Sequence, residues 1–150
     1  MGRARLGIGL LGCDVEGSAV ARALAAHSDL IERRTRRPPA ITAIAIRRPD
    51  KPGDVPAPAS LFTDDPWEVE ARSDVEIIVE VMWGNDPAGA LIETQLATGK
   101  HVVTALAGRL VVPGPGVGGV ATAGAILGDL VGVAAAVVEH SAVENAVVAK

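Results

Sequence analysis

The chain has 150 residues, the length of one ordinary domain that buries a core without help from metals or disulfides. Its net charge of −4 and its three aromatic residues (two Trp, one Phe, no Tyr) exclude a general nucleic-acid surface and base-stacking platforms. Cys13 is the single cysteine, so no internal disulfide forms, and a cytoplasmic location is expected.

Apolar runs of strand length alternate with helical patterns along the chain. Strands are expected at residues 6–11, 40–47, 76–81 and 101–104, and helices at residues 18–31, 66–72 and 87–98. This order is typical of parallel strands joined by crossover helices. The sequence therefore predicts an α/β fold of the Rossmann type, with a doubly wound parallel sheet in a single domain.

Local signals mark the ends of two of these helices. Asp65-Pro66 and Asp86-Pro87 each place a capping acid before a proline at the first helical position. Gly99 then closes the second helix. The signals support helices that begin close to both prolines.

Two charged or proline-rich stretches have simple interpretations. The basic run "RRTRR" at residues 33–37 is expected to be a solvated helix end rather than a phosphate patch. The segment "RPDKPGDVPAPAS" at residues 48–60 is a surface loop and not a domain linker, because strand and helix patterns resume after it.

The last part of the chain is rich in Ala, Val and Gly. A helix is expected from about residue 122 to residue 133, with Thr122 as its cap, and its glycines and prolines argue against a membrane span. The nucleotide-binding domain is expected to cover residues 1–136. For residues 137–150 the pattern leaves open a helix, an edge strand or an oligomer contact.

Several segments together carry a family resemblance. They are "IGLLGCDVEGSAVARAL", "LFTDDPWEV", "DVEIIVEVMWGNDPAGALI", "ATGKHVVTA" and "GPGVGGVATAGAILGDLV". In this order they resemble homoserine dehydrogenase over most of residues 6–133. The resemblance implies an NAD(P)-dependent oxidoreductase fold, with NADP or NAD as the cofactor.

The resemblance also implies that a large part of the enzyme is missing. In that family the strand like "KHVVTA" leads to an Asn-Lys pair and a substrate and dimerisation domain, after which the chain returns to a closing helix. Here Leu106 and Ala107 stand in place of the pair, and the chain runs on into "GRLVVPGPGVGG". The junction falls near residues 105–109. Without the family's catalytic lysine and acids, hydride transfer has no proton partner, so no homoserine dehydrogenase activity is expected.

The glycine turn departs from the dinucleotide-binding pattern. The pattern Gly-x-Gly-x-x-Gly falls on residues 12–17, where the first and third glycines are Gly12 and Gly17. Asp14 replaces the middle glycine, and Glu16 adds a second acid to the turn. A carboxylate about 4 Å from a phosphate charge repels it by roughly 4 kcal/mol at an effective dielectric of about 20. This repulsion would weaken the binding of a cofactor from micromolar to about millimolar. The alternative is that both are simply acids at a helix N-terminus, stabilised by the helix dipole and satisfying free backbone amides.

Other candidate cofactor residues follow from the same comparison. Arg47 and Arg48 end the second strand where an NAD-selective protein offers an acid to the ribose, so NADP is favoured, unless they are ordinary exposed charges. Trp83 either fills the nicotinamide space or is a packing residue of the core or of an interface. The candidate cofactor site comprises Gly12, Cys13, Asp14, Val15, Glu16, Gly17, Arg47, Arg48, Met82, Trp83, Gly84, Thr104, Gly118 and Gly119.

Other chemistry has little support. The three histidines, His27, His101 and His140, show no ligand spacing, so no metal is expected. Cys13 is the one candidate nucleophile; it is either a reactive thiol at a helix start or an inert small residue.

Three functions remain open. The chain is a dinucleotide-binding module, a cofactor-free interaction module, or an enzyme for a different small substrate. Loss of the substrate domain would expose apolar surface, so a homo-oligomer is expected, without a nucleic-acid or membrane partner.

Overall fold

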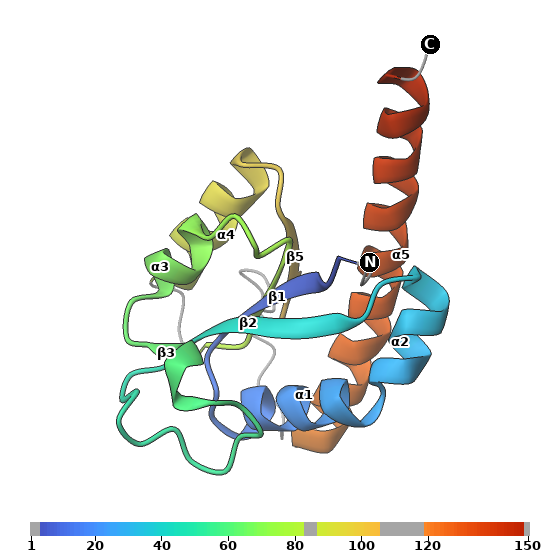
Figure 1. Cartoon of the computed structure of the whole chain (residues 1–150). Helices are drawn as coiled ribbons and strands as arrows, with labels where there is room; N and C mark the ends of the chain where they lie inside the picture. The colour runs from blue at the N-terminus through green and yellow to red at the C-terminus, as the bar shows by residue number, and fades with distance from the viewer. Residues whose placement is uncertain (1–3, 83–86, 106–118, 149–150) are drawn as a thin grey trace, which may run out of the picture.

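The computed structural model describes residues 4–82, 87–105 and 119–148. The elements are β1 (Leu6–Leu11), α1 (Val15–Ala26), α2 (Ser28–Thr35), β2 (Pro39–Ala45), the short 3-10 helix η1 (Ala59–Leu61), β3 (Phe62–Thr63), α3 (Pro66–Ala71), β4 (Ile77–Glu80), α4 (Ala88–Ala97), β5 (His101–Thr104) and α5 (Gly119–Val148). The described strands form one sheet in the order β3-β2-β1-β4-β5, and every pair is parallel (Figure 1). The predicted α/β fold with a doubly wound parallel sheet is confirmed.

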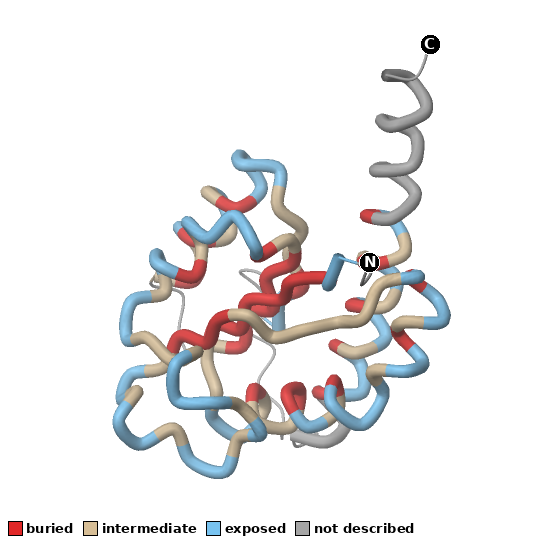
Figure 2. Tube along the Cα trace, viewed as in Figure 1, coloured by how far each residue is buried: buried red, intermediate tan, exposed pale blue. Residues whose placement is uncertain are grey.

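The helices cover both faces of the sheet. Helices α1, α2 and α5 pack together on one face, and α3 and α4 lie on the other (Figure 1). Strand β1 is buried along its whole length, as the continuous red run in Figure 2 shows. A central strand with helices on both sides sees no water on either face, which is why β1 reads as an unbroken apolar run.

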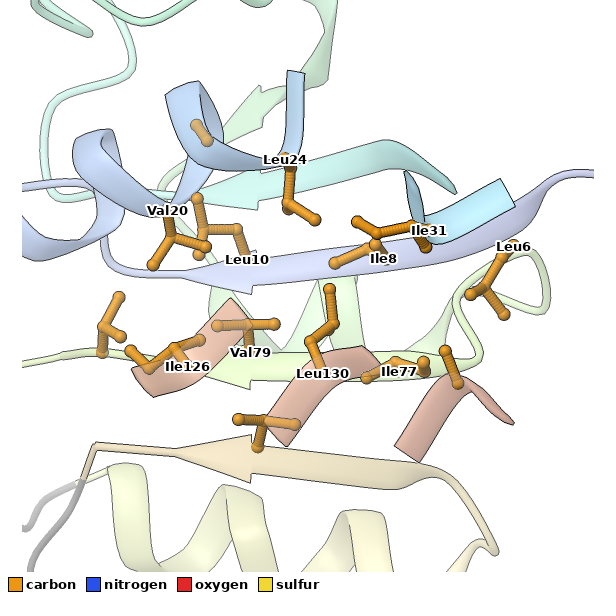
Figure 3. Packing of buried hydrophobic residues seen from close by; sticks show 14 of the residues in the cluster. Leu6, Ile8, Leu10, Val20, Leu24, Ile31, Ile77, Val79, Ile126 and Leu130 are labelled. Atoms are coloured by element: carbon orange, nitrogen blue, oxygen red, sulfur yellow. The ribbon is translucent and has the colours of Figure 1, made fainter. Parts of the chain in front are cut away.

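The larger core lies between the sheet and the α1/α2/α5 layer. Figure 3 shows Leu10 of β1 and Val79 of β4 facing Val20 of α1 and Ile126 of α5, with Leu130 further along α5. A smaller core on the opposite face is formed by residues including Val69, Ile78 and Leu91. Helix α5 is therefore an integral part of the main core.

The first helical region differs from the prediction. A single helix was expected at residues 18–31, but α1 begins at Val15 and the chain bends at His27, where α2 starts. Leu24 before the bend and Ile31 after it both reach the main core. Apolar periodicity alone does not detect such a bend, because both halves keep a buried face.

The helix-end signals at Asp65 and Gly99 are confirmed, and the one at Pro87 is wrong by one residue. The Asp65 carboxylate accepts a hydrogen bond from the Trp67 backbone N–H at 2.9 Å. Gly99 follows α4 with a φ of +78°, the left-handed conformation expected of a closing glycine. Pro87 immediately precedes α4 rather than opening it, and Asp86 lies outside the described residues.

Helix α5 is much longer than predicted. It starts before Thr122, so this residue lies in the first turn and the expectation that it caps the helix is wrong. The helix continues through the tail, so the alternative of an edge strand is also wrong. The run Ala134–Ala136 favours a helix because alanine has the highest helix propensity. Extending a helix that is already formed is also easier than nucleating a new one. Among the described residues, no helix is both long and apolar enough to cross a membrane.

The basic run at residues 33–37 is only partly a solvated helix end. Arg37 forms a two-pronged ion pair with Glu76, with Nη1 donating to Oε2 at 2.7 Å, and Nε donates to the Ala4 carbonyl at 3.1 Å. A further hydrogen bond from Nη2 reaches the Arg5 carbonyl at 2.6 Å. This cluster joins the amino-terminal ends of β1, β2 and β4, a contact between distant segments that charge spacing does not reveal.

The Arg37–Glu76 pair is expected to make stability depend on acid pH. Partial burial raises the pKa of Glu76, but the hydrogen bond and the charge of Arg37 outweigh it, and the net pKa is lowered. A lowered carboxyl pKa stabilises the fold above the unfolded value of about 4.3, and this contribution is lost as pH falls through the folded pKa. Arg37→Met should therefore cost about 1–2 kcal/mol in urea unfolding at pH 7, and less at pH 3.

The exposed pair Arg72–Asp74 provides the matched control. Its side chains are 45% and 51% exposed, against 21% and 33% for Arg37 and Glu76. Arg72→Met should cost less than about 1 kcal/mol, since exposed ion pairs contribute little. Equal losses for both variants at pH 7 would contradict a special role for Arg37.

Candidate functional site

The turn after β1 requires glycine at two positions. Gly12 has a φ of +93°, and a Cβ there would lie 2.9 Å from the Val81 carbonyl oxygen. A Cβ on Gly17 would lie 2.2 Å from the Gly12 carbonyl oxygen. The Gly12 N–H donates to the Ala45 carbonyl at 2.9 Å. The turn is thereby held between the carboxyl ends of β2 and β4.

Asp14 stands immediately before α1 and is exposed. Its carboxylate makes no capping hydrogen bond to the helix, so the alternative that Asp14 satisfies free helix amides is wrong. Glu16 lies in the first turn of α1, as expected of an acid that favours a helix start. The two acids therefore have different surroundings, and only Asp14 lines the cleft described next.

A cleft of about 600 Å³ opens at the carboxyl ends of the strands. Its walls come from the glycine turn, the end of β2 with the loop after it, the turn before α3, and the segments around the end of β4 and the start of α4. The strand order reverses direction at β1, so the cleft lies at the topological switch point, where parallel α/β sheets bind ligands.

The structure brings six of the predicted cofactor residues to this cleft. These are Gly12, Cys13, Asp14, Arg47, Arg48 and Met82. Four others lie outside its lining: Val15, Glu16, Gly17 and Thr104. Val15 is 67% exposed and Gly119 is the first residue of α5. Trp83, Gly84 and Gly118 lie outside the described residues.

Sequence reasoning missed Lys51, which also lines the cleft. Its backbone N–H donates to the Arg48 carbonyl at 3.0 Å, so a tight turn brings it back beside the arginines. Arg22 of α1 donates from Nη1 to the Asp54 carbonyl at 3.0 Å, which ties the proline-rich loop to the body. Lys51 could have been predicted as a site residue, because its loop begins at the carboxyl end of β2, where the candidate arginines lie.

A second missed residue is Glu80, a fully buried carboxylate at the end of β4. It accepts the Met82 N–H and the Thr104 hydroxyl, each at 2.6 Å. Glu80 thus fixes the backbone that leaves β4 along the cleft and joins it to the end of β5. A single acid inside the apolar run "IIVEV" was the available signal.

Cys13 has the surroundings of a weak nucleophile. Burial, with a smaller contribution from Asp14, raises the pKa of its thiol, although Ser18 and Arg22 act in the opposite direction. The sulfur lies 3.9 Å from the Ser18 hydroxyl. A thiol with a raised pKa is mostly protonated at neutral pH and reacts slowly. Within the described residues, no three His, Cys, Asp or Glu side chains are grouped to hold a metal ion.

Sequence comparison relates the chain to homoserine dehydrogenases. A search for known protein families finds no match. The chain is 35% identical over 98 residues to homoserine dehydrogenase of Neisseria gonorrhoeae, and 37% identical over 100 residues to that of Mycobacterium bovis. These matches cover 65% and 67% of the chain but 22% of each relative. The chain therefore spans less than a quarter of the length of these relatives.

Comparison with solved structures finds homoserine dehydrogenases, as the sequence comparison does. A homoserine dehydrogenase from Thiobacillus denitrificans matches with a TM-score of 0.62 and 29% identity, covering 92% of this chain and 28% of that one. The S. aureus homoserine dehydrogenase at pH 6.5 matches with a TM-score of 0.61 and 30% identity, covering 67% of this chain and 25% of that one. At 92% coverage the former match extends into α5. The chain is thus similar in sequence and fold to about a quarter of the length of a homoserine dehydrogenase.

Proposed function

We propose that the chain is a homoserine dehydrogenase-like NAD(P)-binding module without homoserine dehydrogenase activity. The observation that carries the proposal is the cleft at the switch point, which joins a glycine turn to the basic end of β2. Parallel α/β sheets bind dinucleotides at this place, with the glycine turn at the pyrophosphate and the end of the second strand at the adenosine ribose.

The basic end of β2 favours NADP over NAD. Arg47 and Arg48 line the cleft, and both are exposed. The side chain expected of an NAD-selective protein at this place is an acid that accepts the ribose hydroxyls. Arginine there offers charged donors to a 2′-phosphate instead.

The short connection between β5 and α5 supports the absence of catalysis. Strand β5 ends at Thr104 and α5 begins at Gly119, in the region where the family resemblance places a whole substrate domain. Leu106 and Ala107 replace the family's Asn-Lys pair. Oxidation of a hydroxyl by hydride transfer also requires a base for the hydroxyl proton, and such a group is not supplied by Leu or Ala.

Calorimetric titration with NADPH and NADH, together with a turnover assay on homoserine, tests the proposal. NADPH should bind at least about tenfold more tightly than NADH, since one charge-assisted contact is worth about 1.5 kcal/mol or more. No turnover above a blank is expected, with a complete homoserine dehydrogenase as the positive control. Failure of both nucleotides to bind would contradict the binding module, and turnover of homoserine would contradict its inactivity.

We further propose that two copies of the chain associate through α5. Helix α5 packs into the main core through side chains that include Ile126, Leu130 and Val137, and its backbone continues as a helix to Val148. Its carboxyl-terminal end stands clear of the body in Figure 1. Isolated helical turns gain little stability by themselves, so a projecting helix is expected to pack against a partner. We take this partner to be a second copy of the chain, since most soluble oligomers are homo-oligomers.

Light scattering at micromolar concentration tests this association. The full chain should have twice the monomer mass, whereas a chain ending after Val137 should be monomeric with the same NADPH affinity. The truncation leaves the described core contacts of α5 intact. A monomeric full chain, or a truncated dimer, would contradict association through α5.

A further inference from the structure

Glu80 is a buried acid that takes no part in the proposed function. Its side chain is 0% exposed and lies at the carboxyl end of β4. Both carboxylate oxygens accept hydrogen bonds, Oε1 from the Met82 N–H and Oε2 from the Thr104 hydroxyl, each at 2.6 Å. Both donors are neutral, so they satisfy the oxygens without cancelling the negative charge.

No cation balances this charge in the part of the chain that the structure describes. The side-chain ion pairs among the described residues are Arg37–Glu76 and Arg72–Asp74. Neither pair includes Glu80. A buried charge without a counter-ion is unfavourable. A cation that comes close to Glu80 is therefore stabilised, in surroundings where little water screens the attraction.

The Glu80 carboxylate adjoins an uncharged wall of the cleft. Met82, whose N–H it accepts, lines the cleft, and Pro87 and Ala88 line it beside Met82. The cations in the lining all lie at residues 47–51, at the end of β2 and in the loop after it. The β4 side of the cleft thus combines uncharged lining residues with an unbalanced negative charge next to them.

The nicotinamide half of a dinucleotide would lie on this side of the cleft. A doubly wound sheet binds the two nucleotide halves on either side of its switch point, which here is β1. The proposed function puts the adenosine ribose at the end of β2, so the nicotinamide falls at the end of β4. The oxidised ring carries a positive charge and the reduced ring is neutral. Only the oxidised ring can therefore balance the charge of Glu80.

We propose that Glu80 is a specificity-determining residue that makes the module select oxidised over reduced nicotinamide dinucleotides. The buried carboxylate attracts the nicotinamide cation past the backbone of Met82, and the neutral reduced ring gains nothing from it. The inference rests on the proposed nucleotide-binding function and adds the redox state of the ligand. A module that binds in this way without catalysis responds, through its occupancy, to the ratio of the two redox forms.

Calorimetric titration of the native chain with both redox forms tests the selection. NADP⁺ should bind about threefold to tenfold more tightly than NADPH, as expected for one buried charge acting across the wall of the cleft. The same preference should appear between NAD⁺ and NADH, because the 2′-phosphate belongs to the opposite half of the ligand. Equal affinities, or tighter binding of the reduced forms, would overturn the selection and leave the nucleotide module in place.

Glu80→Gln removes the charge and keeps both contacts of the side chain. Its amide oxygen accepts the Met82 N–H, and its amide nitrogen donates to the Thr104 hydroxyl oxygen. NADP⁺ should then bind about as weakly as NADPH, whose own affinity should change less than about twofold. Equal losses for the two redox forms would overturn the proposal, because Glu80 would then only shape the cleft.

Glu16→Gln is the matched control. The same substitution removes one carboxylate from the first turn of α1, outside the lining of the cleft, and it should leave the ratio of the two affinities unchanged. An equal change of the ratio in both variants would overturn the role of Glu80, since net charge would then explain it. If Glu80→Gln does not fold, the preference of the native chain still decides the selection. Binding of none of the four nucleotides would overturn the proposed function itself.

Discussion

Replacing Asp14 with glycine should tighten NADPH binding by about tenfold to a hundredfold, because the substitution removes a carboxylate that lines the cleft beside the glycine turn, where the proposed function places the pyrophosphate. The full Coulomb energy of a close pair, roughly 4 kcal/mol at an effective dielectric near 20, is an upper bound, since Asp14 is exposed and its charge is screened by water. Calorimetric titration with NADPH gives the two dissociation constants directly.

Two controls separate charge from backbone effects. Asp14→Asn removes the charge but keeps a side chain, so it should recover most of the gain if repulsion is the cause. Glu16→Gln removes an equal charge from the first turn of α1, outside the lining of the cleft, and it should change the NADPH affinity less than about threefold. A gain restricted to Asp14→Gly would assign the effect to space and backbone approach; equal gains for Asp14→Asn and Glu16→Gln would contradict the different surroundings of the two acids.

Leu130→Ala should lower the free energy of unfolding by about 2–5 kcal/mol, the range for deleting a fully buried leucine side chain. Leu130 is 0% exposed and lies between the sheet and the α1/α2/α5 layer (Figure 3). The loss should appear in urea unfolding as a single cooperative transition, because α5 and the sheet share one core.

Leu96→Ala is the matched control for this variant. Leu96 also lies in a helix but is 63% exposed, so its truncation should change stability by less than about 0.5 kcal/mol. A small effect at Leu130, equal to that at Leu96, would mean that α5 is an appendage and not part of the core.

Periodicity and local chemistry in the sequence were sufficient for the architecture. The run at β1 is apolar throughout because the strand is buried on both faces, and alternation of such runs with helical patterns predicted the parallel sheet. Asp65 and Gly99 marked helix ends correctly, because capping depends on neighbours in sequence. The bend at His27 was missed because both halves keep a buried face. The length of α5 was missed because the Val-rich, alternating tail suits a strand as well as a helix.

The cleft too was predicted in part from the sequence and was otherwise decided by the tertiary structure. The sequence by itself identified the glycine turn and the arginines at the end of β2, because each follows an apolar strand within a few residues. Only the tertiary structure decided that Asp14 lines the cleft while Glu16 does not, that Lys51 turns back to join Arg48, and that Arg37 pairs with Glu76. These outcomes depend on the direction of side chains and on contacts between distant segments, which the order of residues along one chain does not specify.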